Sequence, residues 1–403
     1  MQRTDQMELL LERLASIPLT WENVYRSPQY TAQFDREVVD LLLILRSNGI
    51  FISIKCQQNP DTRTEDKLNR WVQKSAHSAV RQVGGGIRTS KTRKFWCTHH
   101  RRGKVTFERN QISPVRAVVI VESHQIVQLN RELPLEIDSV PLSYFSTDDF
   151  LNLLNELRTF NDLLRYMDAR SSICQDLQRT VGIEQDLFEN YVLHKGSLGD
   201  LLDLQDIQQQ NFDHKAEIIQ LTKERTFENQ LAAPIEWLSD KLSTRLENHQ
   251  EGLDEVHRAR FDPNSQRSNY LLIQNELCDL VIDERRKLSV LLTHVAKKVE
   301  DTESRQHIGY QAGHLDSKPE FLYIFSSSKS LPRNDILDKC SDLILGGLTH
   351  FGRSNGLLIH YNHDLDNFET IFVQSFEHTS HSRELGTKHF AKLSMSNIPI
   401  KKV

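Results

Sequence analysis

Two short apolar runs lie close together near the N-terminus, at residues 38–45 and 50–54, and Asp40 and Ser53 are the only polar residues within them. Runs of this kind predict buried strands. The residues between them, 46–49, include the dipeptide Asn48-Gly49, which is a strong signal for a hairpin turn. We therefore expect an antiparallel hairpin over residues 37–55, and this hairpin would place Asp40 near Lys55 on adjacent strands.

A helix is expected to follow, from Thr64-Glu65 to Val83, because its apolar residues repeat with helical spacing. Three consecutive glycines, Gly84-Gly85-Gly86, are expected to end it. Further strands are expected at 104–108, 115–122 and 125–129.

The rest of the chain divides into a helical part and a second α/β part. An amphipathic helix is expected at 7–16, and the pattern from about Thr147 to Ser304 is helical and highly charged. A strand at 321–325, a helix from 334 to 351 and strands at 356–360 and 370–373 then follow. The fold class expected is an α/β domain over 1–145 (a mixed sheet flanked by helices), a helical middle over 146–305, and a small α/β domain over 306–403 with a polar tail.

The charge is distributed unevenly along the chain, although the net charge is only −5. Residues 1–116 carry 20 Lys and Arg against 11 Asp and Glu, whereas the remainder carries 30 against 44. A basic N-terminal part on an acidic body is typical of a chain whose N-terminal part meets a polyanion. The sequence has no apolar run of membrane-spanning length and no signal-peptide pattern, so we expect a cytoplasmic protein without a membrane partner.

Asp40 and Lys55 are the residues with candidate chemistry, because charged groups at the ends of buried strands are costly unless they serve a purpose. Cleavage of a phosphodiester bond needs a carboxylate that holds Mg²⁺ or Mn²⁺ with the phosphate, and a lysine that orients the attacking water. Adjacent strands would fix the two groups at a constant distance. The alternative interpretation is a buried ion pair, or a charge that protects the edge of a strand from pairing with another chain.

The order of these elements resembles the core of the PD-(D/E)XK nuclease superfamily, in its restriction-endonuclease-like and NERD-like forms. The resemblance covers residues 8–125 and implies an aspartate on the second core strand and a D/E-x-K triplet on the third. It also implies a helix that follows and carries a glutamine at the active site. In this chain those positions are Asp40, Ser53 to Lys55, and Gln82. The implied activity is metal-dependent cleavage of nucleic acid, with DNA favoured over RNA by the resemblance alone.

Ser53 departs from that pattern, because the family has a carboxylate at this position. Glu37, near the start of the first strand, is the favoured replacement as a catalytic residue and metal ligand, and Glu65 at the start of the helix is the second choice. A catalytically inactive nuclease fold is the alternative that Ser53 leaves open.

A basic segment over residues 88–104 supports a nucleic-acid partner, because it holds seven Lys and Arg and no acidic residue. Such a cluster neutralises phosphates, and the aromatic residues Phe95 and Trp96 within it are suited to stacking on bases. The residues expected to contact nucleic acid are Lys74, Arg88, Lys91, Arg93, Lys94, Arg101, Arg102 and Lys104.

The sequence therefore predicts a DNA endonuclease, and by analogy an anti-phage defence effector. Its helical and C-terminal parts are expected to form a homo-oligomer or to bind a protein partner. The competing hypothesis is a nucleic-acid-binding or assembly protein that uses the same fold as a scaffold.

Overall fold

The computed structural model describes residues 24–31, 35–57, 64–99, 103–198, 201, 203–248, 272–300, 307–329, 331–363, 367–390 and 396–397. Two compact units make up the chain: a first unit of residues 1–226 with 278–281, and a second unit of residues 227–277 with 282–403. The helix expected at 7–16 lies outside the described residues.

A mixed sheet forms the centre of the first unit, as the sequence predicts. Its strand order is β6-β5-β1-β3-β4-β7-β10-β9, and β2 pairs with β1. The β4–β7 and β7–β10 pairs are parallel, and the other pairs are antiparallel. The strands are β1 (Val24–Thr31), β2 (Asp35–Glu37), β3 (Leu41–Leu45), β4 (Asn48–Lys55), β5 (Phe95–His99), β6 (Gly103–Phe107), β7 (Ser113–Val121), β9 (Glu136–Ile137) and β10 (Val140–Ser146).

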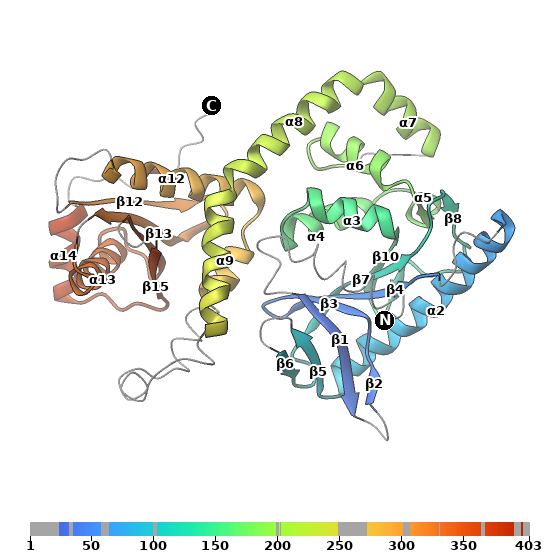
Figure 1. Ribbon diagram of the computed structural model, residues 1–403, viewed down its shortest axis with the longest axis horizontal. Helices are drawn as coiled ribbons and strands as arrows, with labels where there is room; N and C mark the ends of the chain where they lie inside the picture. The colour runs from blue at the N-terminus through green and yellow to red at the C-terminus, as the bar shows by residue number, and fades with distance from the viewer. Residues whose placement is uncertain are drawn as a thin grey trace. The chain divides into compact units, whose positions relative to one another are not determined.

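Helices cover both faces of this sheet, so that its central strands are apolar on each side. The long helix α2 (Glu65–Thr92) packs on one face, where Phe51 of β4 meets its buried side chains. The opposite face packs against α3 (Thr147–Glu156) and α4 (Phe160–Arg170) through residues such as Ile52. Figure 1 shows α2 on one side of the sheet and α3 and α4 on the other.

The hairpin over β3 and β4 is confirmed, but its turn lies earlier than expected. Leu45 pairs with Asn48, so the turn residues are Arg46 and Ser47, and Arg46 takes up the left-handed conformation with φ of 58°. Asn48 and Gly49 are the first residues of β4. Gly49 is needed there for close packing, because a Cβ would lie 2.5 Å from Cγ2 of Ile112.

Helix α2 does not end at the three glycines, which corrects the prediction from the sequence. It continues through them to Thr92, and Gly86 serves close packing rather than termination. A Cβ on Gly86 would lie 2.6 Å from the carbonyl oxygen of Val38, whereas one on Gly85 would meet nothing within 4 Å. Gly86 therefore lets α2 approach the segment that leads into Asp40.

Helices follow the sheet in the first unit, as expected for the middle of the chain. A buried ion pair joins α4 to α6 (Glu184–Leu193): Nε of Arg170 donates to the Glu184 carboxylate at 2.9 and 3.0 Å. Burial raises the pKa of the Glu184 carboxyl, and the charge of Arg170 opposes this shift. The remaining elements are β8 (Val127–Gln128), which pairs with β11 (Thr180–Val181), then α5 (Gln175–Gln178), α7 (Leu204–Asp213) and α8 (Lys215–Leu231), which continues into the second unit.

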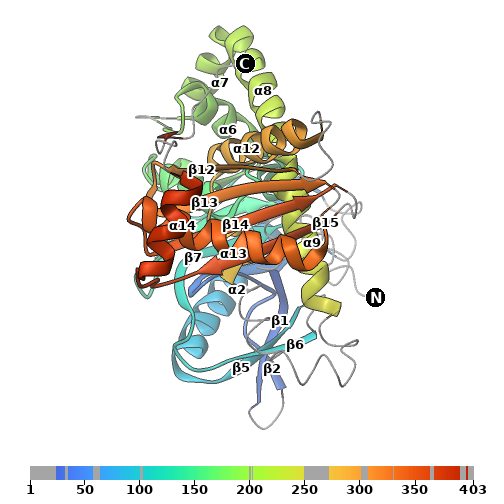
Figure 2. The same ribbon diagram turned by 90° about the vertical axis from the view of Figure 1, so that its left-hand side faces the viewer.

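The second unit is also α/β, with the strand order β15-β14-β13-β12-β16. Helix α13 lies across one face of this sheet (Figure 2), and α14, in the polar tail, packs against α13. Helix α12 packs near Gly309 of β12. The elements are α9 (Ala233–Asn248), α12 (Ile282–Glu300), β12 (His307–Leu315), β13 (Lys318–Lys329), α13 (Arg333–His350), β14 (Asn355–Asn362), β15 (Asn367–Val373), α14 (Ser380–Phe390) and β16 (Ser396–Asn397).

The described residues of the predicted helical region 146–305 are mainly helical, with the short strand β11, and they are divided between the two units. Within the part of the chain that the structure describes, none of the helices combines the length and the apolar character needed to cross a membrane.

Gly86→Ala should destabilise the first unit, because the new methyl group would press on the Val38 carbonyl group. We expect the free energy of unfolding to fall by about 1–3 kcal/mol, the usual cost of overpacking. Gly85→Ala is the matched control: with open space at that position it should stabilise α2 by up to about 1 kcal/mol. Urea denaturation measures both variants, and equal stabilities would contradict the packing role of Gly86.

The second unit should lose stability as the pH falls below 7, because His360 is held neutral. Its two ring nitrogens lie 2.9 Å from the hydroxyl oxygens of Ser326 and Ser328, and burial, with the nearby His363, lowers the pKa of His360 to about 4. The unfolded chain takes up a proton on this ring near its ordinary pKa of about 6.5, but the folded chain does not.

Stability should therefore fall from about pH 6.5 to about pH 4, by about 2 kcal/mol between pH 7 and pH 5. Urea denaturation at the two pH values measures it. In His360→Gln this difference should shrink by about the same amount, and a variant with the full pH dependence would show that other groups cause it.

Candidate active site

Three elements of the first unit position the candidate site. Asp40 directly precedes β3, and its backbone still pairs on both sides: its N–H donates to the Ile52 carbonyl at 3.1 Å, and its own carbonyl accepts from Ser27 at 3.0 Å. Ser53 and Lys55 are two residues apart on β4, so their side chains lie on the same face of the sheet, the face that α2 covers. Gln82 reaches the same place from the middle of α2.

The Asp40 carboxylate is buried and accepts hydrogen bonds from three donors. Oδ2 accepts from the backbone N–H of Ile54 at 2.5 Å and is 3.0 Å from the Ser53 hydroxyl. Oδ1 accepts from Nε2 of Gln82 at 2.9 Å. Such donors make up for the lost hydration of a side chain that is only 5% exposed.

Gln82 connects the aspartate to the lysine. Its Oε1 accepts from Nζ of Lys55 at 2.5 Å and also lies 2.9 Å from the Ser53 hydroxyl. The single hydroxyl proton of Ser53 can serve either Asp40 or Gln82, so this bond can switch between them. Nζ of Lys55 is 4.0 Å from Oδ2 of Asp40, and the lysine side chain, at 26% exposed, is the more accessible of the two charged groups.

The structure therefore brings together Asp40, Lys55 and Gln82, as the sequence predicts, and adds Ser53 as a hydrogen-bond donor. These four side chains lie together at one end of β4, and solvent can reach the lysine among them.

The two carboxylates expected to replace Ser53 belong to other segments than this cluster. Glu37 ends β2, pairs across the strands with Gln29 and is exposed. Glu65 is in the first turn of α2, 17 residues before Gln82, which is about 25 Å along the helix axis. That distance is too long for Glu65 and Asp40 to share one ion.

A magnesium ion at this site would therefore be held by few protein groups. Among the described residues, no group of three or more His, Cys, Asp or Glu side chains has the geometry to hold a metal ion. Mg²⁺ is commonly held by one or two carboxylates, several waters and the phosphates of the substrate. Asp40 fits such a site if Gln82 releases Oδ1.

A further buried acid, Glu122, supports the end of β4 and was not singled out from the sequence. Its carboxylate accepts from the N–H of Gln57 at 2.5 Å, and its own N–H donates to the Lys55 carbonyl at 2.9 Å. The sequence signal was an acidic residue that closes the apolar run of β7. Glu122 therefore holds the backbone at Lys55 and just after it.

The residues expected to contact nucleic acid lie on α2 and at the edge of the sheet. Lys74, Arg88 and Lys91 are exposed on α2, and Arg101 and Arg102 lie outside the described residues. Arg88 pairs with Asp138 at 3.5 Å, and Lys94 pairs with Glu108. A hollow of about 570 Å³ is lined by Arg93, Lys94, Trp96, Lys104 and Thr106.

The two aromatic residues of the basic segment have different environments. Nζ of Lys104 lies 4.0 Å from the ring centre of Trp96, which is partly exposed. Phe95 is fully buried and stacks on Phe107. Only Trp96 of this pair is therefore placed to meet a base.

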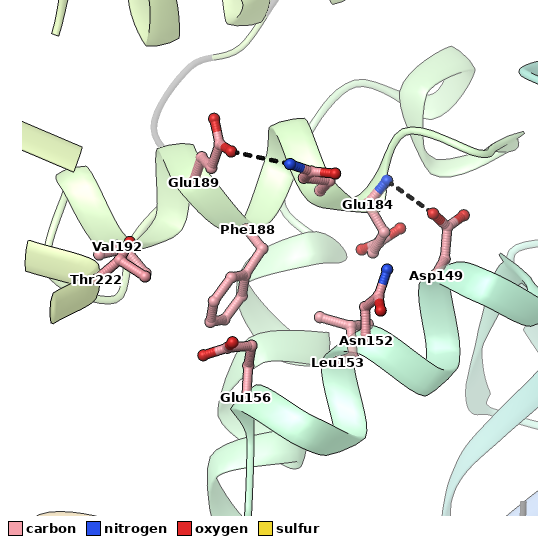
Figure 3. Close-up of a pocket in the computed structure, with 10 residues that line it drawn as sticks. Asp149, Asn152, Leu153, Glu156, Glu184, Phe188, Glu189, Val192 and Thr222 are labelled. Carbon is pink, nitrogen blue, oxygen red and sulfur yellow. Dashed lines mark hydrogen bonds between the residues drawn. The ribbon is translucent and has the colours of Figure 1, made fainter. Parts of the chain in front are cut away.

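A second hollow, of about 310 Å³, opens between α3, α6 and α8 (Figure 3). Its lining includes four acidic residues, and one of them, Asp149, accepts from the N–H of Glu184 at 3.3 Å. This charge disfavours an anionic ligand. None of the residues predicted for the site lines it.

Comparisons with known proteins add no assignment: no family model, no curated protein and no solved structure matches this chain.

Ser53→Asp tests whether the cluster accepts a metal ion. The Ser53 hydroxyl is 3.0 Å from Oδ2 of Asp40, so a carboxylate at this position would create a repelling pair that a divalent cation relieves. We expect this variant to be destabilised in EDTA and to gain about 5 °C or more in melting temperature with millimolar Mn²⁺.

Ser53→Asn is the matched control, because it has the same shape without the charge. Differential scanning fluorimetry measures the response of each variant to Mn²⁺. An equal response of the Asp and Asn variants would mean that no ion binds beside Asp40.

Proposed function

We propose that this protein is a metal-dependent nuclease that cleaves phosphodiester bonds, with DNA as its substrate. The observation that carries the proposal is the hydrogen-bonded cluster of Asp40, Ser53, Lys55 and Gln82 at the end of β4. The β3–β4 hairpin, the helix after it and the parallel strand β7 follow the element order of the PD-(D/E)XK resemblance. The basic residues of α2 and β6 supply the charge that a polyanion requires.

Each residue of the cluster has a role in this reaction. Water attacks phosphorus, the bond from phosphorus to the leaving sugar oxygen breaks, and that oxygen takes up a proton. Asp40 and the substrate phosphate would hold a Mg²⁺ or Mn²⁺ ion, which would supply Lewis-acid stabilisation of the negative charge that develops. Lys55 directs its ammonium group at the attacking water and the phosphate oxygens.

Gln82 and Ser53 position the two charged groups. The Gln82 amide accepts from the Lys55 ammonium group and donates to Oδ1 of Asp40 at the same time. Release of this amide frees one oxygen for a cation and the lysine for the phosphate. Ser53 keeps the other oxygen of Asp40 oriented while that exchange occurs.

A nucleic-acid-binding protein with an inactive nuclease fold is the second candidate. It is favoured by one observation, the serine at position 53, which leaves Asp40 as the carboxylate of this cluster. The two candidates differ in whether the cluster turns over substrate.

Plasmid cleavage with Mg²⁺ or Mn²⁺ tests the proposal. Lys55→Ala and Asp40→Asn should each reduce the rate of nicking by about 10²-fold or more, as does the removal of one transition-state donor in other enzymes. Lys215→Ala, an exposed lysine of α8, is the control and should cleave at the original rate. Undiminished nicking by both site variants would reject the site, and an absence of cleavage with retained DNA binding would favour the inactive fold.

A further inference from the structure

The outer face of α2 carries a regular row of basic residues. Lys67, Arg70, Lys74, Arg81, Arg88 and Lys91 are exposed. Together with the partly exposed His77 and the buried Gly84, which lies against Ile137, they occupy every third or fourth position from 67 to 91. At 100° per residue these positions fall within an arc of about 120°. We call the six exposed Lys and Arg side chains the α2 basic row.

This row lies opposite the face by which α2 packs on the sheet. The side chains buried in the core, such as Val72, Ala79 and Val83, point away from it. Gln82 follows Arg81 directly and is therefore about 100° around the helix from it, on the flank between the two faces. One helix thus reaches the candidate active site and presents a basic surface beside it.

The basic residues of the row repel one another along the helix, and a bound polyanion would relieve this repulsion. Lys67, Arg70 and Lys74 are like charges three and four residues apart, a spacing that destabilises a helix. Acidic residues usually relieve such repulsion. Glu65 and Asp66 do so at the start of α2, but the sequence then holds 11 Lys and Arg and no Asp or Glu from 67 to 107. The described contact of the row with an acid is that of Arg88 with Asp138 at 3.5 Å, beyond these three residues.

The dimensions of the row match a double helix. From Lys67 to Lys91 is 24 residues, or about 36 Å, and one turn of B-form DNA measures about 34–36 Å. A straight, rigid row of positive charges is suited to the rigid phosphate backbone of a duplex. Proteins that hold single strands instead use aromatic platforms, and no position of the row is aromatic.

We infer that the α2 basic row binds the phosphate backbone of a nucleic-acid duplex over about one helical turn, without reading its sequence. The inference rests on the proposed function, since it names double-stranded nucleic acid as the substrate of that site. The backbone that follows the row passes Arg81, next to Gln82, and so comes within reach of Lys55 and Asp40.

Binding in EDTA tests the inference separately from cleavage. Fluorescence anisotropy would follow a labelled duplex of about 24 base pairs, its single strand alone, and vesicles rich in phosphatidylserine, at salt concentrations from about 50 to 200 mM. The test variant is Lys67→Gln with Lys74→Gln and Arg81→Gln, because glutamine preserves helix propensity and removes charge. The matched control is Lys215→Gln with Lys223→Gln and Lys297→Gln, three exposed helical lysines outside α2.

The row variant should bind the duplex about 50- to 500-fold more weakly at 0.1 M salt, and the slope of log K against log salt should fall by about 2 to 3 units. The control should keep both values. Circular dichroism should show that the row variant is folded.

Four results would overturn the inference: no duplex binding by the unaltered protein, an unchanged slope in the row variant, equal or tighter binding of the single strand, or an equal dependence on the row for vesicles. Duplex binding that depends on the row without cleavage would reject the proposed nuclease and support the inference. Cleavage at the same rate in the row variant as in the unaltered protein would support the proposed nuclease and reject the inference.

Discussion

The hydrogen bonds to the Asp40 carboxylate determine how the centre of the first unit fits together. A buried carboxylate is stable only when donors replace the water it has lost. Here the donors come from β4 and α2, while Asp40 itself belongs to the segment before β3. The three segments must therefore meet in one register, and the close approach of Gly86 to Val38 allows α2 to do so. The fold positions the candidate site, and the hydrogen bonds within the site in turn help to fix how these three segments pack.

The sequence was sufficient to predict this meeting because the responsible patterns are local. Two apolar runs set the hairpin that pairs the residues around Asp40 with β4, and helical periodicity places Gln82 on a helix that packs over it. The turn at Arg46-Ser47 and the continuation of α2 through Gly84–Gly86 were not predictable in this way. Glycine signals a turn, a helix end or a close approach, and only the neighbouring atoms distinguish these. At Gly49 and Gly86 the neighbours are Ile112 and Val38, which are remote in sequence.

The metal ligands illustrate a different limit. Glu37 and Glu65 were plausible because each is near a predicted site residue along the chain, but coordination depends on distance in space. An irregular segment, Val38–Asp40, separates Glu37 from β3, and the length of α2 separates Glu65 from Gln82. The position of Glu122 beside Lys55 depends likewise on the parallel pairing of β4 with β7, which the sequence does not specify.

Helix α2 carries the basic row and Gln82 at a fixed angle to each other, and this limits the insertions and deletions that the helix can accept. One inserted or deleted residue between Lys67 and Gln82 would rotate everything before it by about 100° relative to the glutamine, so the basic side chains would turn toward the sheet or away from the site. A change of seven residues would restore the phase almost completely and alter only the length, by about 10 Å. Variation in the length of this helix should therefore come in steps that keep this phase, such as seven or eleven residues.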